Sequence, residues 1–307
     1  MPPTDVAVGL DAGGSSTTVW VQPADAATPA EHAGPAAHPK ARGVDDAAHV
    51  LGALVREAIR PHRPVGTLAV WAGVAGAGRT ADQDALSDPL WTTLHDAADT
   101  VRVEVRSDAA IALEAAFGDE SGVVVIAGTG SIVWGRTTDG STARAGGWGH
   151  RLGDPGSGHA LGRAGLRAVA DALDGGPSTS LRDRVAAEHD IDDGDTLIRK
   201  VADEGLPLAE VAPTVLAAAE EDDEVASAIV EAQAGVLAKR VGWLVERAGP
   251  FAPRVALLGG LTNNPFYAER LEHHIQKQWP DASVAAAENP PVAGALQEAR
   301  RLLEDIG

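Results

Sequence analysis

The chain contains no cysteine, and this absence excludes several kinds of chemistry. Disulfides, zinc sites with cysteine ligands and cysteine-held iron–sulfur clusters all require the residue. The chain also lacks any run of 18 apolar residues, so no transmembrane helix is expected. The opening MPPTDVAVG enters a predicted strand at once and leaves no room for a signal peptide. These features predict a cytoplasmic protein.

Basic residues are scarce as well. The chain has 25 Lys and Arg against 44 Asp and Glu, a net charge of −19, and four lysines. Such an acidic surface argues against binding to nucleic acid or to an anionic membrane. Adaptation to a salty cytoplasm and the codon bias of a GC-rich genome explain this composition equally well. With 307 residues, 44% of them hydrophobic, the chain is long enough for two domains with a sizeable core.

The stretch VGLDAGGSSTTVWV, residues 8–21, predicts two strands joined by a glycine-rich turn. Glycines expose successive backbone amides and short hydroxyls add donors, so the turn can cradle a phosphate chain. A carboxylate at the end of the first strand could hold a phosphate-bound magnesium ion through its waters. Alone, the stretch is also typical of a plain β-hairpin with a long turn. The residues concerned are Asp11, Gly13, Gly14, Ser15, Ser16 and Thr17.

A second copy of this design, VVVIAGTGSIVWGR, occupies residues 123–136. An apolar strand again meets a small glycine turn, and a second strand follows. Two such units indicate duplicated domains that each present a phosphate-binding turn to a shared cleft. Neither is a Walker loop, because no Gly-Lys-Ser/Thr follows. The second turn comprises Gly128, Thr129, Gly130 and Ser131.

Between the two copies, residues 22–43 are rich in Pro, Ala and Gly and predict a loop. Helices are expected at 45–59 and 82–97 and strands at 68–79 and 101–105. Asp108 opens the helix that follows. It could serve as the N-cap, or as a catalytic carboxylate at a strand–helix junction.

The glycine-dense stretch GGWGHRLGDPGSG, residues 146–158, precedes a predicted helix and is not a generic linker. Trp148 could belong to the core and Asp154 could cap a turn, but at least one of them is expected to face a ligand. Residues 177–248 are predicted to be mostly helical. Farther on, VALLGGLTNNP gives a strand and then Gly259-Gly260, where the backbone can pass close to a flat ligand.

Four glycine turns after strands, in this order, resemble the actin-type ATPase superfamily of sugar kinases, Hsp70 and actin. LDAGGSST resembles its first phosphate motif, AGTGS its second and VALLGGLTNNP its adenosine motif. GGWGHRLGDPGSG together with SDAAIAL resembles the N-acetylglucosamine kinase-like branch, the BadF/BadG/BcrA/BcrD-type ATPase family. The resemblance covers essentially the whole chain.

That resemblance implies an α/β fold of two ribonuclease H-like domains with a cleft between them. The expected boundaries are 1–107 with a returning helix at 291–307, and 108–290 with a helical insertion at about 177–248. It also implies an ATP- and Mg²⁺-dependent kinase that phosphorylates an amino sugar, N-acetylglucosamine or glucosamine, at the C6 hydroxyl. A cytoplasmic homodimer is expected.

The resemblance also implies residue roles. Asp108 would be the general base, Asp11 the water-mediated magnesium ligand, and residues 13–17 and 128–131 the phosphate ligands. The adenosine site would be lined by Gly259, Gly260 and Asn263, and the sugar site by His38, Gly147, Trp148 and Asp154.

The sequence departs from the family pattern at two places. Pro155 stands where an acidic residue usually follows the aspartate, and Ala37 and His38 stand where an asparagine is expected. Ring specificity depends on these positions more than phosphotransfer does.

Two alternatives of other kinds stay open: a kinase of another small hydroxylated substrate, and a nucleotide-dependent sugar sensor without catalysis. An activator of a dehydratase is excluded, since that role uses a cysteine-bound iron–sulfur cluster.

Overall fold

The computed structural model describes residues 2–305, which form two compact units. The first comprises Met1–Glu120 and Ala287–Gly307, and the second comprises Ser121–Ala286. The units divide after Glu120 rather than after residue 107, because helix α4 (Asp108–Phe117) packs on the last helix, α11 (Pro291–Glu304). The contact is close: a Cβ added to Gly294 would lie 2.2 Å from the Ile111 carbonyl oxygen.

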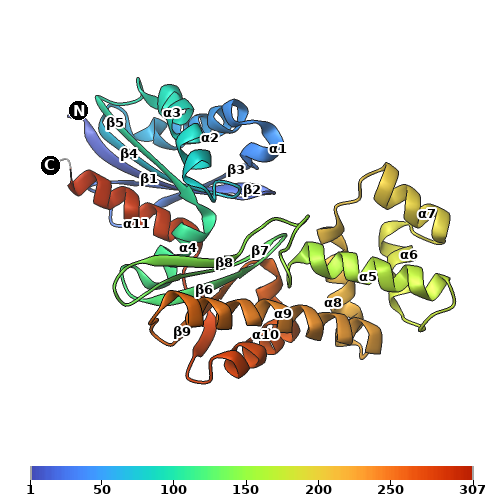
Figure 1. Ribbon diagram of the computed structural model, residues 1–307. Coiled ribbons are helices and arrows are strands. Elements are labelled where there is room, and N and C mark those ends of the chain that lie inside the picture. The colour runs from blue at the N-terminus through green and yellow to red at the C-terminus, as the bar shows by residue number, and fades with distance from the viewer. Residues whose placement is uncertain (1, 306–307) are drawn as a thin grey trace. The chain divides into compact units, whose positions relative to one another are not determined.

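The first unit is built on a five-stranded sheet in the order β3-β2-β1-β4-β5 (Figure 1). The central strand β1 is parallel to β4, and β4 is parallel to β5, whereas β2 and β3 are added antiparallel on the other side. The carboxyl ends of β1, β4 and β5 therefore lie at one edge of the sheet. The strands are β1 (Thr4–Ala12), β2 (Ser16–Pro23), β3 (Ala30–Pro35), β4 (Val65–Val74) and β5 (Thr100–Ser107).

Alternation along β1 explains how both faces of this sheet are covered. Val6, Val8 and Leu10 are buried in the core that also holds residues of α2 (Val44–Ile59) and α3 (Thr80–Leu94). Ala7 faces the other way and packs with Leu296 of α11. Gly9 lies on that same face, where a Cβ would come within 2.4 Å of the Leu296 nitrogen. Two short helices complete the unit, α1 (Pro39–Arg42) and η1 (Arg60–His62).

The second unit repeats this pattern in a sheet of order β10-β9-β6-β7-β8. Its central strand β6 is again parallel to one neighbour and antiparallel to the other, which confirms the duplicated design predicted from the two glycine turns. The strands are β6 (Gly122–Ala127), β7 (Ser131–Arg136), β8 (Thr142–Gly146), β9 (Arg254–Leu258) and β10 (Ser283–Ala286).

Most of the chain between β8 and β9 is helical, as the sequence predicts (Figure 1). The long helix α9 contributes Val230, Leu237 and Val241 to the core of this unit. The α-helices of the unit are α5 (Gly158–Leu173), α6 (Leu181–His189), α7 (Gly194–Ile198), α8 (Ala212–Glu220), α9 (Glu224–Ala248) and α10 (Pro265–Gln278). Shorter turns are the π-helix η2 (Arg199–Asp203) and the 3₁₀ helices η3 (Leu208–Val211) and η4 (Gly260–Asn263).

One expectation about the chain trace is wrong. Residues 22–43 are not all loop, since β3 pairs antiparallel with β2 along Ser16–Pro35 to Val21–Ala30. Its composition hides it, because β3 is an edge strand in which proline and glycine are tolerated. No helix within residues 2–305 is long and apolar enough to cross a membrane.

Candidate active site

In the first unit, the residues predicted to bind magnesium and to act as the general base lie where β1, β4 and β5 end. Asp11 stands beside Gly73 of β4, and Gly73 stands beside Arg106 of β5. Asp108 follows β5 directly as the first residue of α4. The carboxyl edge of parallel strands is where α/β sheets bind ligands.

Ser107, and not Asp108, caps helix α4. The Ser107 side chain accepts a hydrogen bond from the Ala110 backbone N–H at 3.2 Å. The structural alternative for Asp108, that it serves as the N-cap, is therefore wrong. Its Oδ1 accepts one hydrogen bond, from the Ala109 N–H at 2.9 Å. The rest of its hydrogen-bonding capacity is not needed to begin the helix.

The Asp11 and Asp108 carboxyls influence each other electrostatically. Burial, and then the Asp108 charge, raise the pKa of Asp11 from 3.8 to about 6. Burial also raises the pKa of Asp108, against the opposing effects of the Ala109 N–H and the His38 charge. Two carboxyls that disfavour each other's ionisation suit a divalent cation, which stabilises both anions.

The two carboxyls fit a magnesium ion better than they fit a metal whose ligands all come from the protein. Among residues 2–305 no group of three or more His, Asp or Glu side chains could hold a metal ion. Mg²⁺ usually keeps several waters and is bound through one or two carboxylates plus substrate phosphates. Asp11 with Asp108 close by meets that description.

His38 lies close enough to Asp108 for the two side chains to interact electrostatically. It caps helix α1, with Nδ1 accepting a hydrogen bond from the Lys40 N–H at 3.2 Å. Burial, followed by the Lys40 charge, lowers the pKa of His38, while the Asp108 charge acts in the opposite direction. The ring is therefore neutral at pH 7, and because Nδ1 is an acceptor its proton is on Nε2.

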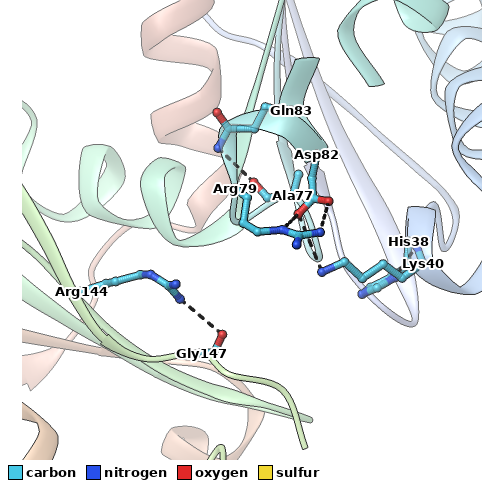
Figure 2. Close-up of polar contacts among 8 residues, drawn as sticks. All are labelled: His38, Lys40, Ala77, Arg79, Asp82, Gln83, Arg144 and Gly147. Atoms are coloured by element: carbon cyan, nitrogen blue, oxygen red, sulfur yellow. Dashed lines mark hydrogen bonds and ion pairs between the residues drawn. The ribbon is translucent and has the colours of Figure 1, made fainter. Parts of the chain in front are cut away.

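The turn after β4 places the His38 ring. Gly76 in that turn has φ of +89°, and a Cβ there would lie 2.7 Å from His38 Cε1. Figure 2 shows how the turn is fixed: Gln83 Nε2 donates to the Ala77 carbonyl at 3.0 Å, and Arg79 grips Asp82 through two nitrogens at 2.7 and 2.8 Å. No side chain larger than glycine would leave His38 where it is.

The first glycine turn is open on its outer side. Gly13 N–H donates to the Ser16 carbonyl at 2.9 Å, which closes the turn, and a Cβ on Gly14 would meet nothing within 4 Å. Ser15 and Ser16 are exposed, but Thr17 is buried and its hydroxyl donates to the Pro35 carbonyl at 2.8 Å. The Thr17 hydroxyl thus ties β2 to β3 and already has an acceptor.

The second turn has the same construction. Gly128 N–H donates to the Gly130 carbonyl at 2.9 Å, and a Cβ on Gly128 would meet nothing within 4 Å. Thr129 is exposed, whereas Ser131 is buried and its hydroxyl donates to the Pro155 carbonyl at 2.8 Å. Each turn thus has an open glycine and one hydroxyl that is used to fix it.

Asp154 is a buried residue of the glycine loop, 6% exposed, with φ of +58°. Its Oδ1 accepts the Gly149 N–H at 3.0 Å, and a Cβ on Gly130 would lie 3.0 Å from its Oδ2. Burial raises the pKa of Asp154 despite the loop amides that favour the charged form. The structure brings Asp154 against the second glycine turn.

Trp148 and Gly147 lie on the exposed part of the same loop. Trp148 is 64% exposed, unlike a core residue, and the Arg144 guanidinium lies 5.0 Å from its ring centre. Arg144 also donates to the Gly147 carbonyl at 3.4 Å, as Figure 2 shows. An exposed, braced indole is suited to stacking on the apolar face of a ligand.

The third glycine pair follows β9 in the same unit. Gly259 has φ of +100°, and a Cβ there would lie 2.4 Å from the Ala127 carbonyl oxygen at the end of β6. Gly260 and Asn263 are exposed. The Gly259 backbone therefore touches the strand that leads into the second glycine turn.

Two residues that hold the glycine loop carry no signal in the sequence. Tyr267 OH donates to the Gly156 carbonyl at 2.6 Å, and Gln233 Oε1 accepts the Gly156 N–H at 3.0 Å. Tyr267 is the single tyrosine of the chain and is fully buried. They lie on α10 and α9, more than 70 positions along the chain, so only the fold reveals the contact.

Known proteins resemble this chain over almost its whole length. The family model described as the BadF/BadG/BcrA/BcrD ATPase family matches residues 8–297. The chain is 28% identical over 308 residues to the N-acetylmuramic acid/N-acetylglucosamine kinase of Clostridium acetobutylicum, covering 95% of this chain and 97% of that protein.

Two solved structures share the fold. A Chromobacterium violaceum protein, solved as a candidate N-acetylglucosamine kinase, superposes with a TM-score of 0.78 at 24% identity, covering 97% of this chain and all of that one. A ROK family glucokinase from Streptomyces griseus, in complex with glucose and AMPPNP, gives a TM-score of 0.58 at 19% identity, covering 96% and 98%.

Proposed function

We propose that this chain, which belongs to the BadF/BadG/BcrA/BcrD ATPase family, is an ATP-dependent sugar kinase that phosphorylates N-acetylglucosamine or glucosamine at the C6 hydroxyl. The Clostridium relative supports a sugar kinase, and the AMPPNP-bound glucokinase of the same fold supports ATP as the donor. The amino sugar and the C6 position are the finer part of the proposal.

One observation carries the proposal for the catalytic residue. Asp108 lies at the carboxyl edge of the first sheet, close enough to Asp11 to raise its pKa. The side chain of Ser107, and not that of Asp108, caps α4. A buried carboxylate that is not the N-cap, with a pKa raised by burial, is a stronger base than an exposed aspartate. We assign it the role of accepting the proton of the sugar hydroxyl.

The remaining work in phosphoryl transfer is positioning and charge neutralisation. We assign phosphate contacts to residues 13–16 in the first unit and 128–130 in the second, where both turns are open. The hydroxyls of Thr17 and Ser131 hold the turns in shape instead. Gly259, Gly260 and Asn263 are assigned to adenosine.

Magnesium would be held by Asp11, through water, together with the phosphates of ATP. When bound, the ion neutralises phosphate charge and lowers the free energy of the ionised Asp11. The chain's own part is to keep that carboxylate buried at the end of β1, in register with Gly73 of β4.

For the sugar we propose His38, Gly147, Trp148 and Asp154. The neutral His38 ring, with its proton on Nε2, can donate to a hydroxyl or acetyl oxygen where relatives are expected to use an asparagine. The exposed Trp148 indole can stack on the sugar. Asp154 is buried, so its contribution would come mainly through the shape of the loop.

A coupled ADP-release assay over a panel of acceptors tests the proposal. The panel contains N-acetylglucosamine, glucosamine, N-acetylmannosamine, N-acetylmuramic acid and glucose. We expect ADP release to be stimulated by the first two above the rest. Nucleotide binding without release on any acceptor would instead identify a sugar sensor, and release on a different acceptor would refute the ring assignment.

A further inference from the structure

A pocket in the second unit is lined by none of the residues assigned to ATP and sugar, although Gly153 and Pro155 in its wall flank Asp154. Its volume is about 270 Å³, and it is lined by the glycine loop, α5 and α9. Three arginines line it: Arg151 from the loop, Arg163 from α5 and Arg240 from α9. No aspartate or glutamate lines it, in a chain whose net charge is −19.

These arginines are not neutralised by the protein. Within residues 2–305, none of the three guanidinium groups has a carboxylate partner, whereas Arg184, Arg199 and Arg270 of the same unit each have one. Three like charges around one pocket make it attractive to an anion, even though Arg151 and Arg163 are exposed and water screens part of their mutual repulsion.

Arg240 gives an independent sign of a missing partner. Its guanidinium stacks over the Trp243 ring at 4.5 Å, which holds it in place, yet its Nε is buried and has no hydrogen-bond partner in the described chain. A buried donor without an acceptor costs free energy, and native proteins rarely retain one without a reason.

Gln233 adds a further donor to the pocket. Its Oε1 accepts the Gly156 N–H, so the amide is oriented and its NH₂ group is left available. The pocket is thus lined by guanidinium and amide donors around a small volume. Pro155, which accepts the Ser131 hydroxyl through its carbonyl, forms another part of the wall.

We propose that this pocket binds an anion carrying a phosphate group, either free inorganic phosphate or a phosphate monoester. Guanidinium groups match phosphate oxygens through paired N–H donors, and a dianion balances several of them better than a single carboxylate does. Such a ligand would join the loop that holds Trp148 and Asp154 to helices α5 and α9. The pocket shares this loop with the proposed sugar residues but is lined by none of them, so its ligand can be tested separately from the kinase assignment.

Isothermal titration calorimetry of the full chain tests this, with inorganic phosphate and glucose 6-phosphate as probes. Arg163→Gln removes a pocket guanidinium, and Arg167→Gln is the matched control, since Arg167 is exposed one turn later on α5 and does not line the pocket. We expect the phosphate Kd to rise about 10-fold or more in Arg163→Gln and to be unchanged in Arg167→Gln. Arg240→Gln should weaken binding similarly.

The proposal is overturned if the wild-type chain shows no saturable binding of either probe. It is also overturned if Arg163→Gln binds as tightly as wild type, or if Arg167→Gln weakens binding equally. Tighter binding of glucose 6-phosphate than of phosphate, lost in Arg163→Gln, identifies a phosphate ester as the ligand. Equal affinities identify free phosphate.

Discussion

The hydroxyl of Ser107 caps helix α4, whose first residue is Asp108. The neighbouring residues therefore have different roles: Ser107 stabilises the helix, and Asp108 is the proposed general base. Ser107 is 3% exposed and accepts the Ala110 N–H, whereas Asp108 makes a single local hydrogen bond. Substituting one residue should therefore affect folding, and substituting the other should affect the reaction.

Ser107→Ala should lower the free energy of unfolding by about 1 kcal/mol, the usual effect of losing an N-cap. Asp108→Asn should not lower it, because burial already disfavours the charged form of Asp108. Urea unfolding of both variants at pH 7 measures this. A larger loss in Asp108→Asn than in Ser107→Ala would show that the aspartate, after all, stabilises the helix.

Much of the fold follows from local patterns. Apolar, mostly β-branched segments on each side of Gly13 and Gly128 predict β1–β2 and β6–β7, and both pairs are present. Strand β3 is not predicted from the sequence, because an edge strand can carry glycine and proline. The hydrogen bonds that Tyr267 and Gln233 make to Gly156 cannot be predicted either, because contacts between residues far apart in the chain leave no periodic pattern in the sequence.

Asp11→Asn should stabilise the protein in a pH-dependent way. Because the folded pKa of Asp11 is raised to about 6, ionisation costs stability as the pH rises from about 4 through 6. The free energy of unfolding of the wild type therefore falls over this pH range, whereas that of Asp11→Asn does not. A shift of that size corresponds to about 3 kcal/mol.

The measurement is the difference in free energy of unfolding between Asp11→Asn and wild type at pH 8 and at pH 4, without magnesium. We expect a gain at pH 8 that disappears at pH 4. Asp84→Asn, at an exposed position of α3, is the control and should show no such gain. A difference that is independent of pH would contradict the account.

Gly259 and Gly260 allow packing to be separated from ligand binding. Gly259→Ala should destabilise the protein by more than about 2 kcal/mol, since φ is +100° and the new Cβ would lie 2.4 Å from the Ala127 carbonyl oxygen. Gly260→Ala meets nothing within 4 Å and should leave stability within about 1 kcal/mol.

If adenosine passes close to this backbone, Gly260→Ala should still weaken ATP binding several-fold. Thermal unfolding and nucleotide titration of the two variants give both quantities. Wild-type ATP affinity in a stable Gly260→Ala variant would remove Gly260 from the adenosine site.

Asp154→Ala should destabilise the glycine loop by about 2 kcal/mol, because it leaves the Gly149 N–H without its acceptor and puts alanine at φ of +58°. Asp154→Asn should be close to wild type in stability, since asparagine tolerates that φ and keeps an oxygen acceptor. Thermal unfolding compares the two. Equal losses would show that the charge, and not the acceptor, holds the loop.

The measurement that tests the central claim most directly is the turnover of Asp108→Asn with the best acceptor of the panel, alongside its ATP affinity. Loss of a general base predicts a fall in kcat of at least ~100-fold with ATP affinity little changed. Near-normal turnover in that variant would contradict the assignment of Asp108 as the residue that deprotonates the sugar.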